Sequence, residues 1–256
     1  MSSAAAVNLD AIWHDLECAG YQEDLPVWRA LATGGPVLDV GAGTGRVSLD
    51  LAARGVPVVA LDVDAALLRA LERRAAGLGI ETVVADAREF SLGRRFSLVV
   101  VPMQTLQLLG GPAGRAAFLR CAREHLEPGG RVAAAIADAL GCFDVEHDAP
   151  PPPAVLEIEG VRYASQLHSV VEEDGRAVLY RRRVIVGPGD RVESRDSVVR
   201  LDRVSAREVA AEARAPGFVP EPDRLVPETD EYLGSTVVVL RGPAGVSVRP
   251  AAQGAS

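Results

Sequence analysis

The feature that most constrains the fold is an alternation of short apolar runs with helical patterns between Pro36 and about Ala137. Five runs have the length and content of buried strands, and they cover residues 37–40, 58–61, 82–85, 98–101 and 132–136. Between them, apolar residues recur with helical spacing over residues 47–53, 65–76 and 116–126. Buried strands separated by helices form a parallel sheet with helices on both faces, so the sequence predicts an α/β, doubly wound domain.

A different pattern follows this region. Residues 144–153 form a charged, proline-rich connector, which excludes a helix or a central strand there. Residues 161–172 and 177–186 then alternate with period two around a turn signal at residues 173–175. A second turn at residues 187–190 precedes a further alternating segment over 191–200. These patterns predict an antiparallel meander, followed by a helix over 205–213 and a last strand over 235–240.

The strand at residues 37–40 leads directly into the sequence Gly41-Ala42-Gly43-Thr44-Gly45, which opens a helix. A glycine-rich turn between a strand and a helix lets a ligand approach the backbone, and the helix amides favour an anionic group. The next strand ends on Asp62. A carboxylate at that position is placed to accept hydrogen bonds from a ribose diol.

The spacing of the glycines separates two classes of ligand. A dinucleotide-binding turn has its third glycine three residues after the second, where the helix packs closely against the strand. Here that position is Arg46, and Gly45 comes one residue earlier. A long arginine side chain at this turn argues against NAD. An NAD-dependent oxidoreductase stays an alternative that cofactor binding decides.

Residues 37–45, with Asp39 two positions before the first glycine, resemble the first motif of the class I S-adenosylmethionine-dependent methyltransferases. The resemblance covers residues 21 to 240, roughly, and is strongest to the small-molecule branch, in which a β-rich insertion follows the fifth strand. It implies a Rossmann-like, seven-stranded doubly wound sheet with an antiparallel β insertion. It also implies S-adenosyl-L-methionine as cofactor and a small-molecule acceptor, methylated on nitrogen or oxygen.

The resemblance further implies roles for particular residues. The glycine turn would hold the methionine end of the cofactor, Asp62 its ribose, and Asp86 its adenine amino group. The cofactor positions are Gly41, Ala42, Gly43, Gly45, Asp62, Val63, Asp86, Ala87, Pro102 and Met103. The expected acceptor positions are Gln104, Tyr163 and Leu167.

Methyl transfer takes place at a carbon that the sulfonium charge already activates, so alignment and desolvation are the main requirements. A base is needed only if the acceptor is protonated. The sequence therefore identifies no catalytic residue and leaves two candidates, Tyr21 before the first strand and His168 in the meander. His14 is expected on a surface helix.

These inferences divide the chain into four parts. Residues 1–35 are expected to form an N-terminal helical cap, and residues 36–140 with 201–243 the cofactor-binding domain. Residues 141–200 are expected to form a β-meander that serves as an acceptor lid or as a contact in a homodimer. Residues 244–256 are expected to be a disordered tail. A catalytically inactive module that binds S-adenosylmethionine is an alternative to the enzyme.

Charge and hydropathy exclude two classes of binding partner, nucleic acid and the membrane. The formal net charge is −8 and there is no basic stripe, which excludes nucleic acid. The one basic run is Arg181-Arg182-Arg183, where alternation places the middle arginine on the opposite strand face. No apolar stretch is long enough to span a membrane, and the N-terminus lacks a signal-peptide pattern.

The three cysteines, Cys18, Cys121 and Cys142, are widely separated, which favours the reducing cytoplasm over a disulfide framework. A metal site is also not expected. His147 with Asp144 and Asp148 offers too narrow a set of ligands for one.

Overall fold

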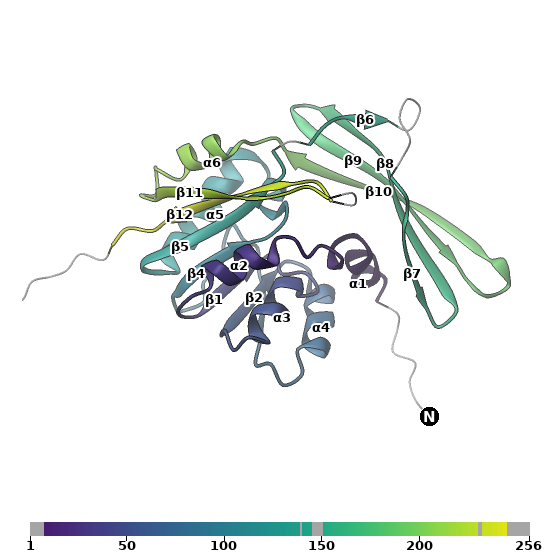
Figure 1. Ribbon diagram of the computed structural model, residues 1–256, viewed down its shortest axis with the longest axis horizontal. Coiled ribbons are helices and arrows are strands. Elements are labelled where there is room, and N and C mark those ends of the chain that lie inside the picture. Colours follow the sequence, from purple (N-terminus) through teal and green to yellow (C-terminus); the bar gives the residue numbers. More distant parts are fainter. Residues whose placement is uncertain (1–7, 139, 145–150, 230–231, 245–256) are drawn as a thin grey trace, which may run out of the picture.

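The computed structural model describes residues 8–138, 140–144, 151–229 and 232–244, which form two β-sheets with helices around the first (Figure 1). Except for Ala244, the segment predicted to be a disordered tail lies outside the described residues, as do residues 145–150 of the predicted connector.

The first sheet has seven strands in the order β11-β12-β5-β4-β1-β2-β3. β1 to β5 pair in parallel, and β12 and β11 extend one edge in the antiparallel sense. This arrangement confirms the predicted doubly wound sheet. The strands are β1 (Val37–Val40), β2 (Val58–Asp62), β3 (Glu81–Val84), β4 (Phe96–Val101), β5 (Leu126–Ile136), β11 (Val219–Val226) and β12 (Ser235–Arg241).

Two local differences from the sequence prediction concern this sheet. β5 begins at Leu126, although the sequence predicts a strand only over residues 132–136. β11 was not predicted, because Pro220 and Pro222 argue against a strand. They are tolerated because β11 is the edge strand, and its register shifts between Glu221 and Arg224.

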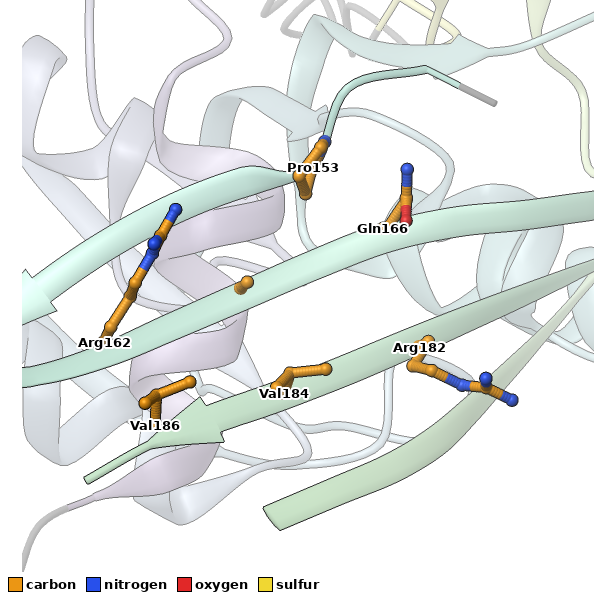
Figure 2. A pocket seen from close by; sticks show the side chains of 7 residues that line it. Pro153, Arg162, Gln166, Arg182, Val184 and Val186 are labelled. Carbon is orange, nitrogen blue, oxygen red and sulfur yellow. The ribbon is translucent and has the colours of Figure 1, made fainter. Parts of the chain in front are cut away.

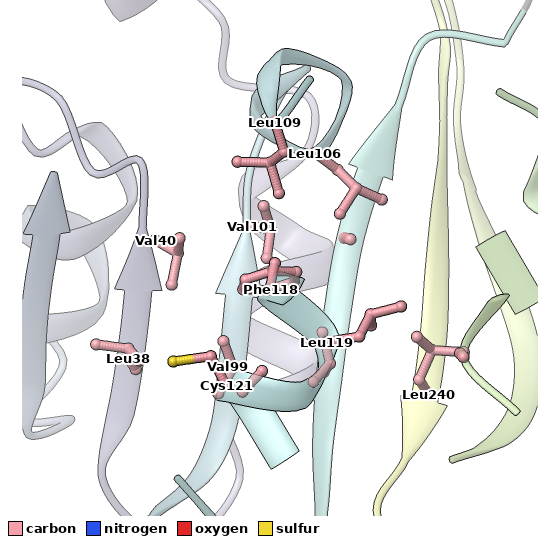
Figure 3. Close-up of a cluster of buried hydrophobic side chains, with 14 of the residues drawn as sticks. Leu38, Val40, Val99, Val101, Leu106, Leu109, Phe118, Leu119, Cys121 and Leu240 are labelled. Atoms are coloured by element: carbon pink, nitrogen blue, oxygen red, sulfur yellow. The ribbon is translucent and has the colours of Figure 1, made fainter. Parts of the chain in front are cut away.

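The sheet is buried on both faces. On one face, Leu38 and Val99 pack with Phe118 of α5 (Figure 3). On the other face, Val37 and Val100 pack in a cluster with Trp28. All four residues of β1 are buried, as expected for a strand in the middle of a parallel sheet. The helices are α3 (Arg46–Ala52), α4 (Ala65–Arg74), α5 (Gly111–Glu124) and α6 (Ala206–Glu212), with a 3-10 turn η2 (Thr105–Leu108) after β4.

The second sheet is antiparallel and has the order β10-β9-β8-β6, with β7 paired to β8. The β8–β9 hairpin turns at Asp174 and Gly175, whose positive φ angles of 50° and 73° confirm the predicted turn. The strands are β6 (Phe143–Asp144), β7 (Ala154–Ile158), β8 (Val161–Glu173), β9 (Arg176–Val186) and β10 (Val192–Asp202), with a short turn η3 (Pro188–Asp190).

A bulge in β8 changes which side chains share a face. Leu167 pairs with Arg181 and Ser169 with Tyr180, so His168 is an extra residue in the strand. Simple alternation placed Val170 on the face opposite Leu167. The structure instead places Val170 beside Leu167, in one buried cluster, because the bulge shifts the alternation by one residue.

The N-terminal segment consists of α1 (Leu9–His14), the π-helical turn η1 (Asp15–Ala19) and α2 (Leu25–Leu31). α1 and η1 lie between the two sheets (Figure 1). Toward the second sheet, the Trp13 ring packs edge-on against Tyr163, with centroids 5.7 Å apart. Glu17 accepts hydrogen bonds from Arg183 at 2.8 and 2.9 Å. Toward the first sheet, Asp15 forms an ion pair with Arg74 of α4.

A buried ion pair joins this segment to the helix that follows the glycine turn. Arg46 donates to Asp24 at 2.5 and 2.7 Å and to the Tyr21 carbonyl at 2.7 Å. The two charged side chains are only 8% and 1% exposed. Each charge therefore depends on the other for its compensation.

Arg46→Met is expected to lower the free energy of unfolding by about 3 kcal/mol, because it leaves the Asp24 carboxylate buried without a partner. Urea unfolding measures the loss. Arg29→Met, which removes a more exposed arginine from an ion pair with Asp50, is the matched control and should cost clearly less. If both variants lose the same free energy of unfolding, the buried ion pair between Arg46 and Asp24 stabilises the protein no more than the exposed pair does.

Candidate functional site

A cavity of about 300 Å³ opens between the two sheets, at the carboxyl ends of β1 and β4. This is the edge at which open parallel sheets bind ligands. The first sheet and its turns supply Asp39, Gly41, Ala42, Arg46, Val47, Pro102, Met103, Gln104, Thr105 and Leu108. The N-terminal segment supplies His14, Glu17 and Cys18, and the second sheet Leu179, Arg181, Val199 and Leu201.

The start of the glycine turn, Gly41 and Ala42, forms part of one wall, whereas the predicted cofactor residues Gly43, Gly45 and Asp62 do not line the cavity. Gly41, Gly43 and Gly45 have φ angles of 73°, 56° and 94°, in the left-handed region that favours glycine. A Cβ atom at Gly41 would meet Thr105, and one at Gly43 would collide with the His14 ring. The backbone of the turn is thus available for close contact only because side chains are absent.

Asp62, at the end of β2, is tied to this turn. One carboxylate oxygen accepts a hydrogen bond from the Gly43 amide at 2.7 Å, and the other accepts from the Asp64 amide at 2.9 Å. Each oxygen retains a further lone pair. The predicted ribose-binding carboxylate is therefore also a structural support of the turn.

Asp39 gives the cavity a buried negative group. Its side chain accepts a hydrogen bond from the Ser48 hydroxyl at 2.6 Å through Oδ2. The other oxygen, Oδ1, is buried and has no hydrogen-bond partner among the described residues. Burial raises the pKa of this carboxyl to about 6. A buried acceptor without a partner calls for a donor or a cation in the adjacent space.

His14 also lines the cavity, contrary to the expectation of a surface helix. The Thr44 hydroxyl donates to Asp15 at 2.7 Å, so its oxygen accepts from His14 Nδ1 at 3.1 Å. This arrangement puts the ring proton on Nδ1 and leaves a lone pair on Nε2, the atom that faces Gly43. Burial lowers the pKa of His14, which keeps the ring neutral at neutral pH.

The other predicted cofactor residues fall into two groups. Pro102 and Met103 line the cavity, as does Gln104 of the expected acceptor set, and Met103 has a positive φ of 55°. Val63, Asp86 and Ala87 do not line it. Val63 is 73% exposed and Asp86 forms an ion pair with Arg88 near the surface.

The two catalytic candidates do not line the cavity. The Tyr21 hydroxyl lies 3.3 Å from Ser235 Oγ, and His168 is the extra residue of the β8 bulge. The expected acceptor residues Tyr163 and Leu167 are also one step removed, because Tyr163 packs on Trp13 and Leu167 joins the cluster around Val170.

A second hollow of about 300 Å³ lies on the far face of the second sheet. Figure 2 shows its lining from neighbouring strands, which includes Arg162, Arg182, Val184 and Val186. Alternate residues of β9 face this hollow and the cavity, so the sheet itself separates the two.

Within the described segments, no group of three or more His, Cys, Asp or Glu side chains is arranged to hold a metal ion. His147 and Asp148 lie outside those segments. The helices of the described chain are all too short or too polar to cross a membrane.

The fold and the turn define an α/β domain with a cavity at the carboxyl edge of its sheet. A family profile described as "Methyltransferase domain" matches residues 37–130. The cypemycin N-terminal methyltransferase of a Streptomyces species is 36% identical over 97 residues, which are 38% of this chain and 40% of that protein. The aligned segment thus spans less than half of the relative's length.

Two solved structures share the fold over nearly the whole chain. A sugar N-methyltransferase from a Streptoalloteichus species is 19% identical with a TM-score of 0.71, over 95% of this chain and 96% of that chain. An amino pentose methyltransferase from Micromonospora echinaspora, solved with bound S-adenosylmethionine, is 20% identical with a TM-score of 0.67. That alignment covers 94% of this chain and 99% of the other.

Residues 37–130 thus match a methyltransferase-domain profile, and the whole described chain shares its fold with solved S-adenosylmethionine-dependent methyltransferases. One of these structures holds S-adenosylmethionine, and this is the cofactor that the matched profile and the shared fold indicate. The residues present fit S-adenosylmethionine, since a carboxylate oxygen of Asp39 that lacks a partner lies on one cavity wall with Gly41 and Ala42 of the glycine turn.

Gly43→Ala is expected to destabilise the protein by about 1–3 kcal/mol more than Gly77→Ala, because the new Cβ must displace His14. Gly77 has a similar backbone, with φ of 84°, but its Cβ would meet nothing within 4 Å. Thermal or urea unfolding gives both values. The difference between the two destabilisations should become smaller when both variants also carry His14→Ala. If it stays the same, the new Cβ collides with a group other than His14.

Proposed function

We propose that the protein transfers a methyl group from S-adenosylmethionine to a nitrogen atom of a small molecule. The observation that carries this proposal is the buried Asp39 Oδ1 atom, which has no partner among the described residues and lies beside the glycine turn. The methionine end of the cofactor carries an ammonium group that would supply the missing partner. The carboxylate of the same end would meet the backbone amides of the turn and of the start of α3.

The rest of the cofactor would follow the carboxyl edge of the sheet. Asp62 has lone pairs left to accept from ribose hydroxyls. Beyond it, Val63, Asp86 and Ala87 are the proposed surroundings of the adenine. These residues lie outside the enclosed cavity, which fits a cofactor whose reactive end is buried and whose base is nearer the surface.

S-adenosylmethionine supplies the activated methyl group, and this chain supplies alignment and exclusion of water. Pro102, Met103 and Gln104 line the cavity between the glycine turn and the second sheet, where the acceptor would lie. The wall formed by β9 and β10 is mainly aliphatic, with Leu179, Val199 and Leu201. A dry, shaped site of this kind holds two reactants in a near-attack geometry.

Nitrogen is the favoured acceptor atom for two reasons. Two of the similar proteins carry N-methyltransferase or N-terminal methyltransferase in their names. In addition, an amine that is protonated at neutral pH must lose its proton before it can attack, and His14 offers a neutral ring with a lone pair on Nε2. We propose His14 as this base, in place of Tyr21 or His168.

The second sheet acts in this proposal as the acceptor lid. Its cavity-facing side contributes Leu179, Arg181, Val199 and Leu201, while Tyr163 and Leu167 support that wall from positions beside it. The far face, with the hollow shown in Figure 2, is left for the alternative role of contact in a homodimer.

Asp39→Asn is expected to weaken binding of S-adenosylhomocysteine by at least about tenfold at pH 7.5, because the ammonium group loses an ionic partner. The wild-type affinity should itself fall below pH 6, by up to about tenfold per pH unit, since protonation of the Asp39 carboxyl removes the same charge. Calorimetry between pH 5 and pH 8 measures both effects.

The Asp39→Asn affinity should be flat across this range. Asp50→Asn, which changes an aspartate of helix α3 outside the cavity, is the control and should keep the wild-type dependence. A wild-type affinity that does not change between pH 5 and pH 8 would contradict the contact between Asp39 and the ammonium group.

His14→Gln is expected to lower kcat by about a hundredfold, because glutamine keeps a polar group but cannot take the proton of the acceptor. The wild-type rate should fall on the acid side as His14 becomes protonated, at a pH below its ordinary pKa, and the variant should lack that fall. The assay is transfer of a labelled methyl group to an amine acceptor.

The matched variant is His168→Gln, which changes a histidine that does not line the cavity. Loss of activity in His168→Gln with activity retained in His14→Gln would reverse the assignment. Tight binding of S-adenosylhomocysteine with no turnover of amine or alcohol acceptors would instead indicate a binding module.

A further inference from the structure

Three consecutive arginines in β9 have three different environments. Arg183 forms two hydrogen bonds with Glu17, and its guanidinium lies 5.4 Å from the centre of the Trp13 ring. Arg182, on the opposite face, pairs with Asp196 of β10 at 3.1 Å. Arg181 lines the cavity, and the described residues provide it with no hydrogen bond or ion pair.

The surroundings of Arg181 are apolar on its own sheet. Leu179 and the residue paired with it, Val199, line the cavity beside Arg181, and the strand neighbours of Arg181 across β8 and β10 are Leu167 and Ser197. Arg181 helps to lower the pKa of the nearby Glu17 carboxyl, but Glu17 is hydrogen-bonded to Arg183, so the half-buried Arg181 guanidinium has no ion-pair partner of its own among the described residues. Arginine also has the fork geometry that suits a carboxylate or a phosphate.

The other charges of the cavity are already matched. Glu17 accepts hydrogen bonds from Arg183 and from the Ser165 hydroxyl, and Arg46 forms an ion pair with Asp24. Cys18 adds no charge, because burial raises the pKa of its thiol to about 11. Asp39 faces the ammonium group of the cofactor in the proposed function. Arg181 is the charge that remains, and it lies on the acceptor wall.

We infer that Arg181 binds an anionic group of the acceptor, so that the substrate is an amine that also carries a carboxylate or a phosphate. This inference rests on the proposed function, because it takes the β9–β10 wall as the acceptor side. The anion would anchor the acceptor at the second sheet and leave its nitrogen facing the glycine turn. The distance between anchor and nitrogen would then select the substrate.

The test compares acceptors that have an anionic group with analogues in which that group is replaced or absent. Leucine is paired with leucinamide, and glucosamine 6-phosphate with glucosamine, so that the two pairs distinguish a carboxylate from a phosphate. Binding of each compound to the protein saturated with S-adenosylhomocysteine is measured by calorimetry, and turnover by labelled-methyl transfer. The wild type should bind the anionic member of at least one pair at least about tenfold more tightly.

Arg181→Gln should abolish this preference while the affinity for S-adenosylhomocysteine changes less than about twofold. Arg181→Lys keeps the charge and should retain part of the preference. Arg182→Gln, one residue away on the opposite face, is the matched control and should behave as wild type. Circular dichroism melting shows that each variant is folded.

Three results would overturn the inference. The first is a wild type that shows no preference in either pair, and the second is an Arg181→Gln variant that keeps the preference. The third is a large loss of S-adenosylhomocysteine affinity in Arg181→Gln, which would assign the arginine to the cofactor. Failure of the wild type to bind S-adenosylhomocysteine at all would refute the proposed function itself, and this step is measured first.

Discussion

The hydrogen bond from the Gly43 amide to the Asp62 carboxylate is the interaction on which the site depends. It joins the residues that follow two neighbouring strands and holds a turn with three positive φ angles. A glycine-rich backbone has little conformational preference of its own, so contacts with neighbouring residues must hold it in one conformation. With the turn in place, Gly45 caps α3, which positions Arg46 for its contact with Asp24. The N-terminal segment is thereby placed over the cavity.

The cavity lies between the N-terminal segment and two sheets, and the walls formed by the two sheets differ in charge. The first sheet contributes carboxylates, with Asp39 on the wall and Asp62 behind it. The second sheet contributes aliphatic side chains and the cation of Arg181. A cofactor with an ammonium and a sulfonium group suits the first wall, and an apolar or anionic acceptor suits the second. The electrostatic division thus runs along the direction in which a methyl group would move.

The sequence predicted those parts of the site that are local. The glycine turn, Asp62 and residues 102–104 were placed correctly at strand ends, because a buried strand followed by a turn fixes where the next residues lie. His14, Glu17 and Arg181 were not foreseen as cavity residues. Their position depends on the packing of the N-terminal segment between two sheets. Local sequence patterns do not predict such long-range packing. The bulge at His168 was likewise invisible, since an alternating strand and a bulged one have the same composition.

The short segment from Trp13 to Glu17 contacts both halves of the site. His14 lies against Gly43, while three residues later Glu17 is bound to Arg183 of the second sheet. A ligand that moves this segment at one wall therefore also moves it at the other. Coupling of this kind is reciprocal: a cofactor that improves acceptor binding must itself be held more tightly once the acceptor is bound.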